Sequence, residues 1–481
     1  MSHAFSRGLL SALAAVPFLI ACGGNSGTPG AINSAQCSGP SCPVQGPPPS
    51  TPSANALCPA TADIVKNTYL GGAGSGEIVS LNIDATAMSY KLTWLESPIP
   101  VAAGATQPTR AGITVTGHLA HPPAGFLPTA EQTRCAFILQ PGSGTVPQHN
   151  PTNPTYDGTT YTTVTNPLNP PMILVGQGGV AGGGIPGAEI AYTGLIFDPF
   201  TSPLFPIPDR KFDFYPFIGF ATVDTNLSDL AGTYNSLMYH IQPTKTYKAV
   251  GTQSIETFDA NGACTSPSGA CVTTGQPWTA NASGTYFTSA LAPQTTGPNT
   301  AHVEDLIIPG GIPLTLPISA NANMILGKVN GALVPLIIRT GVADPTNVVL
   351  DDESGIALLS PASTVASGAI DGGYVGADSN FKYTATLIKG ATGTFINPST
   401  QAAESGFGLQ YGVASPGLVT AADAQSGTNG FVISAGSLYA VLLQGTTGNE
   451  VENGGITPSS AIPGQTTSSM PYFGIGAQIS K

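Results

Sequence analysis

The chain has 481 residues, enough for two or three domains, and 41% of them are apolar, which suffices for sizeable cores. Only 8% are charged, the formal net charge is −12, and the fourteen basic residues are scattered. Because phosphate-binding surfaces need clustered Lys and Arg, we expect no nucleic-acid partner and no polybasic lipid-binding patch. The surface must be made polar by Ser, Thr, Asn, Gln and glycine-rich turns, as is typical of exported β proteins.

The N-terminus carries an export signal. Arg7 precedes an apolar run from Leu9 to Ile20, which is too short to span a bilayer permanently but has the length of a signal-peptide core. The run ends in Leu19-Ile20-Ala21-Cys22, which resembles a bacterial lipobox. We therefore predict a lipoprotein signal peptide over residues 1–21 and a membrane anchor through a lipidated Cys22. Gly23 is not the aspartate of an inner-membrane retention signal, so we expect the outer membrane, on its periplasmic face or at the cell surface.

Six further cysteines remain for disulfides once Cys22 carries the lipid, because an exported chain meets an oxidising compartment. The spacing favours Cys37 with Cys42 and Cys264 with Cys271, and by elimination Cys58 would meet Cys135. Sequence alone allows other pairings. Zinc binding is the alternative, but no spacing shows a CxxC pair or a nearby histidine, and we expect no metal and no cofactor.

Residues 22–60 predict a tether, because they are rich in Gly, Pro and Ser and show no periodicity. From Tyr69 onward the pattern is that of strands, with near alternation of apolar and polar residues in Ile78–Ile83 and Tyr90–Leu95. Turn residues punctuate these runs, and a helical period is almost absent.

A loose repeat indicates three β meanders, each opening with small residues beside a tyrosine, at Tyr69, Tyr234 and Tyr374, and ending in an apolar strand. We therefore predict an all-β fold of repeated antiparallel β-meander modules over residues 61–200, 201–345 and 346–481. Barrel-like or sandwich-like modules are favoured, since they hide strand edges, and a β-propeller with long loops is the alternative.

Several phrases of the mature chain resemble an uncharacterised lipoprotein family of beta-proteobacteria (Burkholderia-type), a domain of unknown function. The resemblance spans most of the mature chain and implies a Gram-negative origin, with no catalytic residues to carry over. The phrases are Gly76–Val79, Leu95–Pro98, Leu127–Glu131, Tyr215–Phe220, Ala231–Asn235 and Asp371–Ser379.

The glycine-rich stretch Ile173–Gly184 superficially matches a dinucleotide-binding loop. Such a loop needs a following helix, which Pro186 and Gly187 would interrupt, so we expect close-packed or mobile backbone and no nucleotide.

His118, His121 and Glu131 could meet at a metal ion, but Pro122-Pro123 favours a rigid surface turn. The acidic run Asp351–Glu353 lacks the alternating spacing of a calcium loop and reads as a solvated turn.

The aromatic segment after Arg210-Lys211 is the candidate ligand-binding platform. Its residues are Phe212, Phe214, Tyr215 and Phe217. The alternative is a strand whose aromatic side chains face a core.

These patterns favour a non-enzymatic envelope lipoprotein that binds a surface ligand or has a structural role, since no catalytic motif is recognisable and no catalytic residue can be named. The alternative is a glycan-active envelope hydrolase whose carboxylates converge only in three dimensions. Its first candidates are Asp209, Asp213, Asp351, Asp352 and His240. A cleft lined by two carboxylates would favour the hydrolase, whereas a Gly-, Asn- or Thr-rich or aromatic surface would favour binding.

Overall fold

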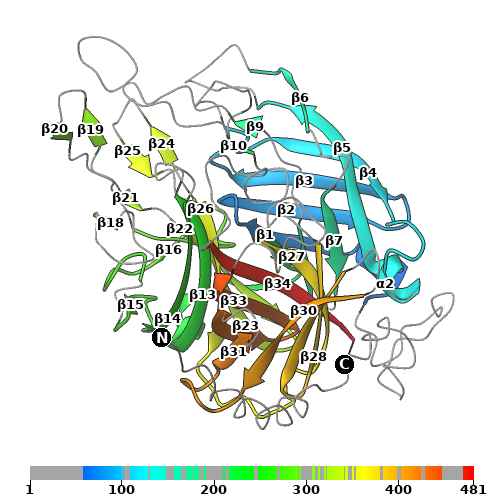
Figure 1. The fold of residues 1–481 in the computed structure, drawn as a ribbon. Helices are drawn as coiled ribbons and strands as arrows, with labels where there is room; N and C mark the ends of the chain where they lie inside the picture. The colour runs from blue at the N-terminus through cyan, green and yellow to red at the C-terminus, as the bar shows by residue number, and fades with distance from the viewer. Residues whose placement is uncertain are drawn as a thin grey trace, which may run out of the picture.

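In the computed structural model, nearly every regular element is a strand (Figure 1). The helices of the described part are short, namely α1 (Thr61–Ile64), α2 (Ala130–Cys135) and the 3-10 helix η2 (Leu227–Leu230). None of the helices in that part is long and apolar enough to cross a membrane. The structure describes residues 58–99, 101, 109–127, 130–147, 157–163, 170–176, 178–183, 189–190, 210–211, 216–242, 248–267, 271–290, 292–293, 306–308, 312–314, 319–320, 322–340, 342–344, 349–351, 354–379, 383–397, 402–423, 428–446 and 470–480.

The first unit is a closed antiparallel barrel. Its strands follow the order β4-β3-β2-β1-β11-β8-β7-β5, and β5 pairs back onto β4, while the short β6 extends the sheet from β5. The strands are β1 (Thr68–Ala73), β2 (Glu77–Asp84), β3 (Ser89–Glu96), β4 (Thr114–Ala120), β5 (Ala136–Thr145), β6 (Thr160–Thr162), β7 (Met172–Val175), β8 (Gly179–Gly182) and β11 (Phe217–Phe220).

Alternation along β3 decides which side chains fill this barrel. Tyr90, Leu92 and Trp94 are buried, while the residues between them face outward. The Tyr90 ring lies across the neighbouring strands, where its hydroxyl donates to the Gln140 carbonyl at 2.8 Å. A Cβ at Gly142 would come within 2.4 Å of that hydroxyl oxygen, so the absence of a side chain there makes room for the tyrosine.

The second unit is an open sheet, which we call the half-barrel. Its order is β15-β14-β13-β26-β23-β22-β17-β16, with β12 paired to β22. The strands are β12 (Val223–Asp224), β13 (Gly232–Gln242), β14 (Lys248–Phe258), β15 (Cys264–Thr265), β16 (Thr279–Ala280), β17 (Phe287–Thr288), β22 (Ala322–Val329), β23 (Ala332–Arg339) and β26 (Ser354–Pro361).

The third unit is a closed eight-stranded barrel in which each strand pairs with the next and the last pairs with the first. The strands are β27 (Gly372–Asp378), β28 (Tyr383–Lys389), β29 (Thr392–Ile396), β30 (Ala403–Gln410), β31 (Val419–Asp423), β32 (Thr428–Ala435), β33 (Leu438–Thr446) and β34 (Met470–Ser480).

Four two-stranded ribbons complete the described strands. They are β9 (Glu189–Ile190) with β10 (Arg210–Lys211), β18 (Ala292–Pro293) with β21 (Ser319–Ala320), β19 (Leu306–Ile308) with β20 (Ile312–Leu314), and β24 (Val342–Asp344) with β25 (Val349–Asp351).

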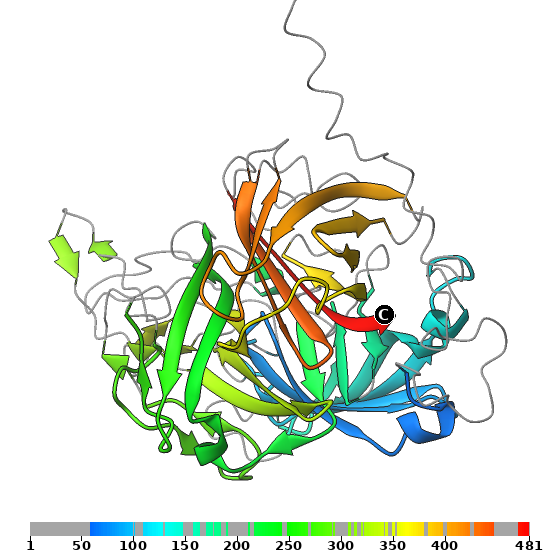
Figure 2. The ribbon, with the colours of Figure 1, turned by 90° about the horizontal axis from the view of Figure 1, so that it is seen from below.

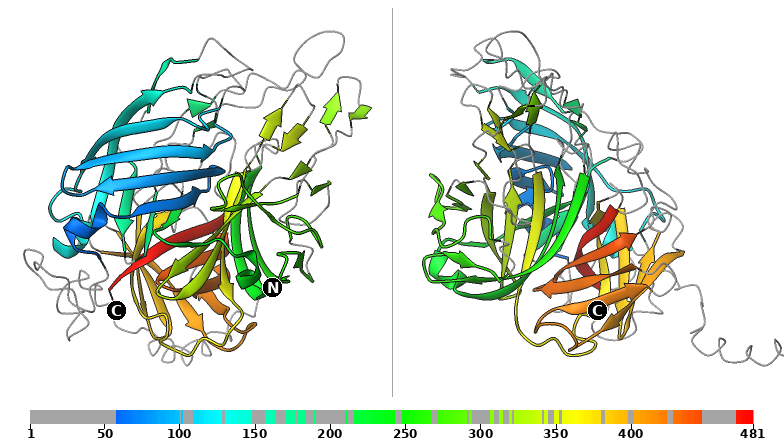
Figure 3. Two further views of the ribbon diagram at one scale, coloured as in Figure 1. Left: turned by 180° about the vertical axis from the view of Figure 1, so that it is seen from behind. Right: turned by 60° about the vertical axis from the view of Figure 1, so that its left-hand side comes forward.

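One apolar cluster joins the three units where the outer faces of both barrels pack against the half-barrel, and each barrel has a further cluster inside it (Figure 2). Strand β34 lies at the meeting point of the three units, since it closes the third unit and also contacts β8 and β14 (Figure 3). Residues 471–480 of this strand are all buried. Hydrogen bonds between described residues also join the first barrel to the half-barrel. Thr340 Oγ1 donates to the Gly76 carbonyl at 2.8 Å, and the Tyr286 hydroxyl donates to Glu96 Oε1 at 2.7 Å.

The predicted all-β fold of antiparallel, barrel-like modules is confirmed, and the described sheets do not form a propeller. Tyr69, Tyr234 and Tyr374, which open the three predicted meanders, are all buried in the first or second strand of a unit. The domain limits at 200/201 and 345/346 stay a prediction. Residues 1–21 and the tether as far as residue 57 lie outside the described residues.

Candidate functional site

Of the predicted aromatic platform, only Phe217 lies within the described residues. Phe212, Phe214 and Tyr215 lie outside the described residues, so ligand binding by them stays a prediction. Phe217 is fully buried in the core of the first barrel, on β11. It therefore lacks the solvent access that a ligand platform requires, and the alternative of a core-facing aromatic strand describes this residue.

The glycine-rich stretch forms the tight β7–β8 hairpin of the first barrel. Gly178 has φ +81°, a conformation that suits a glycine in the turn, and a Cβ at Gly182 would come within 2.1 Å of the Met172 carbonyl oxygen. Close packing of backbone explains these glycines, as expected.

The two neighbouring histidines occupy the outside of the first barrel. His118 and His121 are both exposed, and His121 Nδ1 lies 2.9 Å from the Ala136 carbonyl oxygen, with its ring against Phe137. Among the described residues no group of three or more His, Cys, Asp and Glu side chains could hold a metal ion.

Of the five residues named for a hydrolase, His240 and Asp351 lie within the described part of the chain. His240 is fully buried in β13 of the half-barrel. Asp351 ends β25, and Asp209, Asp213 and Asp352 lie outside the described residues.

Sequence reasoning missed a buried ionic centre inside the first barrel. Arg110 donates from Nε to Glu77 Oε1 and from Nη2 to Glu77 Oε2, each at 2.6 Å, and neither side chain is exposed to solvent. Ser97 Oγ and Ser75 Oγ also donate to this carboxylate, at 2.6 and 3.1 Å. The carboxylate is thus neutralised and saturated with donors, as a buried charge must be.

Aromatic rings surround the guanidinium. The Arg110 guanidinium carbon lies 4.5 Å from the Trp94 ring centroid, in a cation–π contact, and Tyr161 packs edge-on against Trp94 at 5.9 Å. Burial by itself would lower the pKa of Arg110, but the charge of Glu77 and the hydrogen bonds of Glu77 and Tyr161 raise it overall. Arg110 therefore stays protonated beside the carboxylate of Glu77.

The third unit is filled in the same way by aromatic side chains. The ring centroids of Tyr374 and Tyr439 are 4.6 Å apart. The ring centroid of Phe395 lies 5.2 Å from those of Phe407 and Tyr472. Tyr374 donates to the Ile370 carbonyl at 2.9 Å, and burial raises the pKa of Tyr374 and Tyr439 above the usual range. Eight strands enclose just enough room for side chains, and these rings occupy it.

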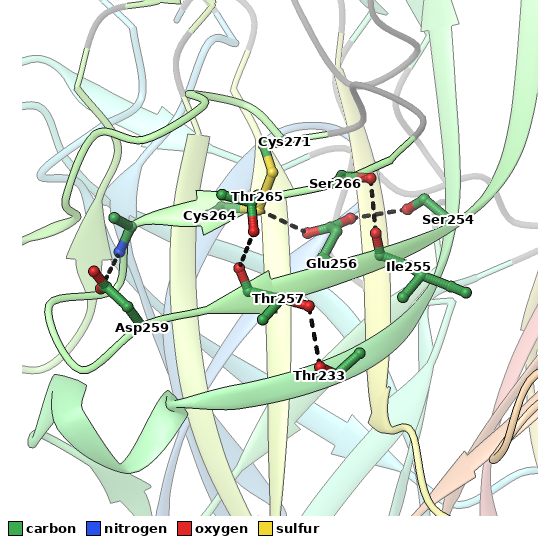
Figure 4. Close-up of a disulfide and its surroundings, with 11 residues drawn as sticks. Thr233, Ser254, Ile255, Glu256, Thr257, Asp259, Cys264, Thr265, Ser266 and Cys271 are labelled. Carbon is green, nitrogen blue, oxygen red and sulfur yellow. Dashed lines mark hydrogen bonds between the residues drawn. A yellow bond between two sulfur atoms is a disulfide. The ribbon is translucent and has the colours of Figure 1, made fainter.

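A disulfide and a buried acid meet at one edge of the half-barrel (Figure 4). Cys264 is bonded to Cys271, and Cys264 Sγ lies 3.9 Å from Glu256 Oε2, while Ser254 Oγ donates to Glu256 Oε1 at 3.0 Å. Burial raises the pKa of Glu256 to about 7, and the hydrogen bond from Ser254 opposes that rise only in part.

The predicted pair of Cys58 and Cys135 is also disulfide-bonded, with a Cα–Cα distance of 6.2 Å. It joins the start of the described chain to the end of α2 beside β5. Cys37 and Cys42 lie outside the described residues, as does Cys22, and their pairing and lipidation stay predictions.

The outer wall of the first barrel carries an ordered array of hydroxyl groups. One row runs directly across five adjacent strands, from β2 to β6, because each member is the cross-strand partner of the next. The row is Ser80, Thr93, Thr114, Thr145 and Thr160. The Oγ1 atoms of Thr93 and Thr114 are 2.8 Å apart, at hydrogen-bonding distance.

A second row lies two residues along each strand, on the same side of the sheet. It is Asn82, Lys91, Thr116, Ser143 and Thr162. The last four are exposed and Asn82 is partly exposed. We call the two rows together the hydroxyl face; strands β2 to β6, which carry it, form the broad blue-to-cyan wall of Figure 1.

Two segments of the sequence, Thr114-Val115-Thr116 and Thr160-Tyr161-Thr162, show the alternation that underlies this face. In both segments the central residue, Val115 or Tyr161, lies in the barrel core. Alternation indicates that the threonines share the outer side of a strand. It does not indicate which strands are neighbours, so the rows could not be assembled from the sequence.

Comparison with known families matches residues 89–477 to a family described as "Protein of unknown function (DUF2957)". The chain belongs to the DUF2957 family. The match covers most of the described structure, from β3 of the first barrel to β34, and therefore includes most of the hydroxyl face of this DUF2957 protein. No curated protein matches the sequence.

Among solved structures, this DUF2957 protein is similar to the isotype 1 transferrin binding protein B (TbpB) from serogroup B Neisseria meningitidis. The sequence identity is 9% and the TM-score is 0.16; the alignment covers 84% of this chain and 66% of that chain. The DUF2957 chain thus spans slightly less than two thirds of TbpB.

Proposed function

We propose that the protein is a lipid-anchored, non-enzymatic component of the cell envelope of beta-proteobacteria that binds a partner with its outer surface. The lipobox-like Leu19–Cys22 supports the anchor, and the uncharged tether after it would hold the β-structured body away from the membrane.

One observation carries the binding role, namely that the side chains of the chain itself fill both barrels. Trp94, Arg110 and Tyr161 occupy the first barrel, and the rings around Tyr439 and Phe395 occupy the third unit. A partner therefore meets the molecule from outside, where the hydroxyl face offers an ordered polar surface. This Thr-rich surface is the kind that favours binding over hydrolysis.

The anchor is tested by expressing the full chain and its Cys22→Ser variant in a Gram-negative host with labelled palmitate. We expect label and outer-membrane fractionation for the wild type, and an unlabelled, soluble periplasmic product for Cys22→Ser. Cys37→Ser is the matched control and is expected to keep both label and membrane association. Unchanged fractionation of Cys22→Ser would refute the anchor.

A further inference from the structure

The hydroxyl face has the geometry of a binding site for an extended ligand. In a β-sheet, neighbouring strands lie about 4.8 Å apart, and successive residues on the same side of one strand lie roughly 6.8 Å apart. Strand pairing therefore places the residues Thr114, Thr116, Ser143 and Thr145 at the corners of one such cell. The array extends on both sides of this cell, from Ser80 to Thr160.

The side chains of this face are held ready for binding. Threonine is β-branched, so its χ1 angle is already restricted in a strand, and little rotamer freedom is lost when its hydroxyl binds a ligand. Directly beneath the face, Leu81, Leu92, Val115 and Tyr161 are buried in the barrel core, which keeps the strands in register.

Charge and apolarity restrict the class of ligand. Lys91 is the one charged residue in the two rows, so the face has no set of charges to recognise a polyanion or a nucleic acid. It has no aromatic or large aliphatic side chain in either row, whereas the centres of protein interfaces and membrane-binding surfaces depend on such side chains.

Hydroxyl groups both donate and accept hydrogen bonds, and so do the hydroxyls of a sugar chain. We propose that the hydroxyl face binds a neutral polysaccharide, with the chain lying along the rows and successive sugar hydroxyls pairing with successive Thr and Ser hydroxyls. This inference rests on the proposed function, since it names the partner of an envelope binding protein.

Each hydrogen bond adds little to the free energy of binding, because it replaces a hydrogen bond to water. Recognition therefore depends on many contacts along one polysaccharide chain. The test must therefore detect weak binding to long polymers. Native gel electrophoresis of the purified mature protein, lacking the lipid, through gels that contain dextran, mannan or a soluble β-glucan meets this need. Alginate, a charged polysaccharide, serves as the comparison polymer.

The decisive variants change three exposed threonines of the face. Thr116, Thr145 and Thr162 are changed together to Val, which keeps the β-branched shape and removes the hydroxyls. The matched control changes three exposed threonines elsewhere, Thr222, Thr279 and Thr392, to Val. A second set changes the same three face threonines to Ser, which keeps the hydroxyls, and thermal unfolding verifies that each variant is folded.

We expect at least one neutral polymer to retard the wild type, the control variant and the variant with three Ser substitutions. The variant with three Val substitutions in the face should need at least a tenfold higher polymer concentration for the same retardation. The inference is overturned if no neutral polymer retards the wild type, if only alginate does, or if the folded variant with three Val substitutions in the face behaves as the wild type. These results leave the membrane anchor untouched, because the Cys22→Ser fractionation tests it separately.

Discussion

Arg110 and Glu77 form a bidentate ion pair at 2.6 Å in the interior of the first barrel, with both side chains fully enclosed. The two residues are 33 positions apart in the chain, and their contact joins the start of β2 to the segment that enters β4. A buried pair of this kind stabilises the fold only while both partners are present, because either one alone is an uncompensated charge.

We therefore expect Arg110→Met to lower the free energy of unfolding by about 3–5 kcal/mol. Urea unfolding followed by the fluorescence of Trp94 measures the loss, in a Trp278→Phe background that removes the other tryptophan. Arg110→Met combined with Glu77→Leu is expected to recover most of it, since no charge is then left in the core. Lys66→Met, which breaks the exposed pair with Asp63, is the control and is expected to change little. Equal effects of Arg110→Met and Lys66→Met would contradict the ionic role.

Glu256 is expected to make the protein less stable as the pH rises. Its pKa is raised from 4.5 to about 7 on folding, so the folded state holds a proton that the unfolded state has already released between these values. Below pH 4.5 the carboxyl is protonated in both states and has no effect on stability. As the pH rises through 7, the free energy of unfolding falls by about 3 kcal/mol in total.

The measurement compares the urea midpoints of the wild type and Glu256→Gln from pH 4 to pH 8. Gln keeps the shape of a protonated carboxyl without its charge, so the difference between the two proteins isolates this group from the other carboxylates. We expect the variant to gain stability relative to the wild type as the pH rises; a difference independent of pH would contradict the raised pKa.

The two disulfides in the described chain are expected to differ in their contribution. Cys58–Cys135 spans 77 positions and Cys264–Cys271 spans 7, and a longer closed loop restricts the unfolded chain more. We expect about 4–5 kcal/mol to be lost on replacing both members of the long pair by Ser, and about 2–3 kcal/mol for the short pair. Thermal unfolding ranks the two double variants, and mass spectrometry of the exported wild type should find no free thiol at these four positions.

Gly430 in the third unit is expected to tolerate no side chain. A Cβ at this position would come within 1.8 Å of the Leu442 carbonyl oxygen on the neighbouring strand, so the backbone would have to move. We expect Gly430→Ala to cost about 1–3 kcal/mol or more and to increase cleavage of this unit in limited proteolysis. Gly408→Ala is the matched control, because its Cβ would meet Ala422 at an ordinary 3.4 Å, and we expect a near-neutral effect. A similar melting temperature for both variants would contradict this explanation.

Much of the fold follows from local sequence signals. The alternation in Tyr90–Leu95 predicted a strand, and Tyr90, Leu92 and Trp94 of that strand lie in the core of the first barrel. The tight spacing of Cys264 and Cys271 likewise predicted a bond that the structure contains. The aromatic segment ending at Phe217 gave the wrong expectation for that residue, because strand composition is the same for an exposed aromatic face and for a core.

The sequence by itself determined that the chain is a β protein and that strands such as Ser89–Glu96 alternate apolar and polar residues, and it predicts an export signal before them. These features depend on the two-residue period of a strand and on short contiguous motifs, which are local properties. Only the tertiary structure decided that Arg110 meets Glu77 and that Thr93, Thr114, Thr145 and Thr160 form one row. Barrel closure and strand register set those contacts, and both depend on pairings between segments far apart in the chain.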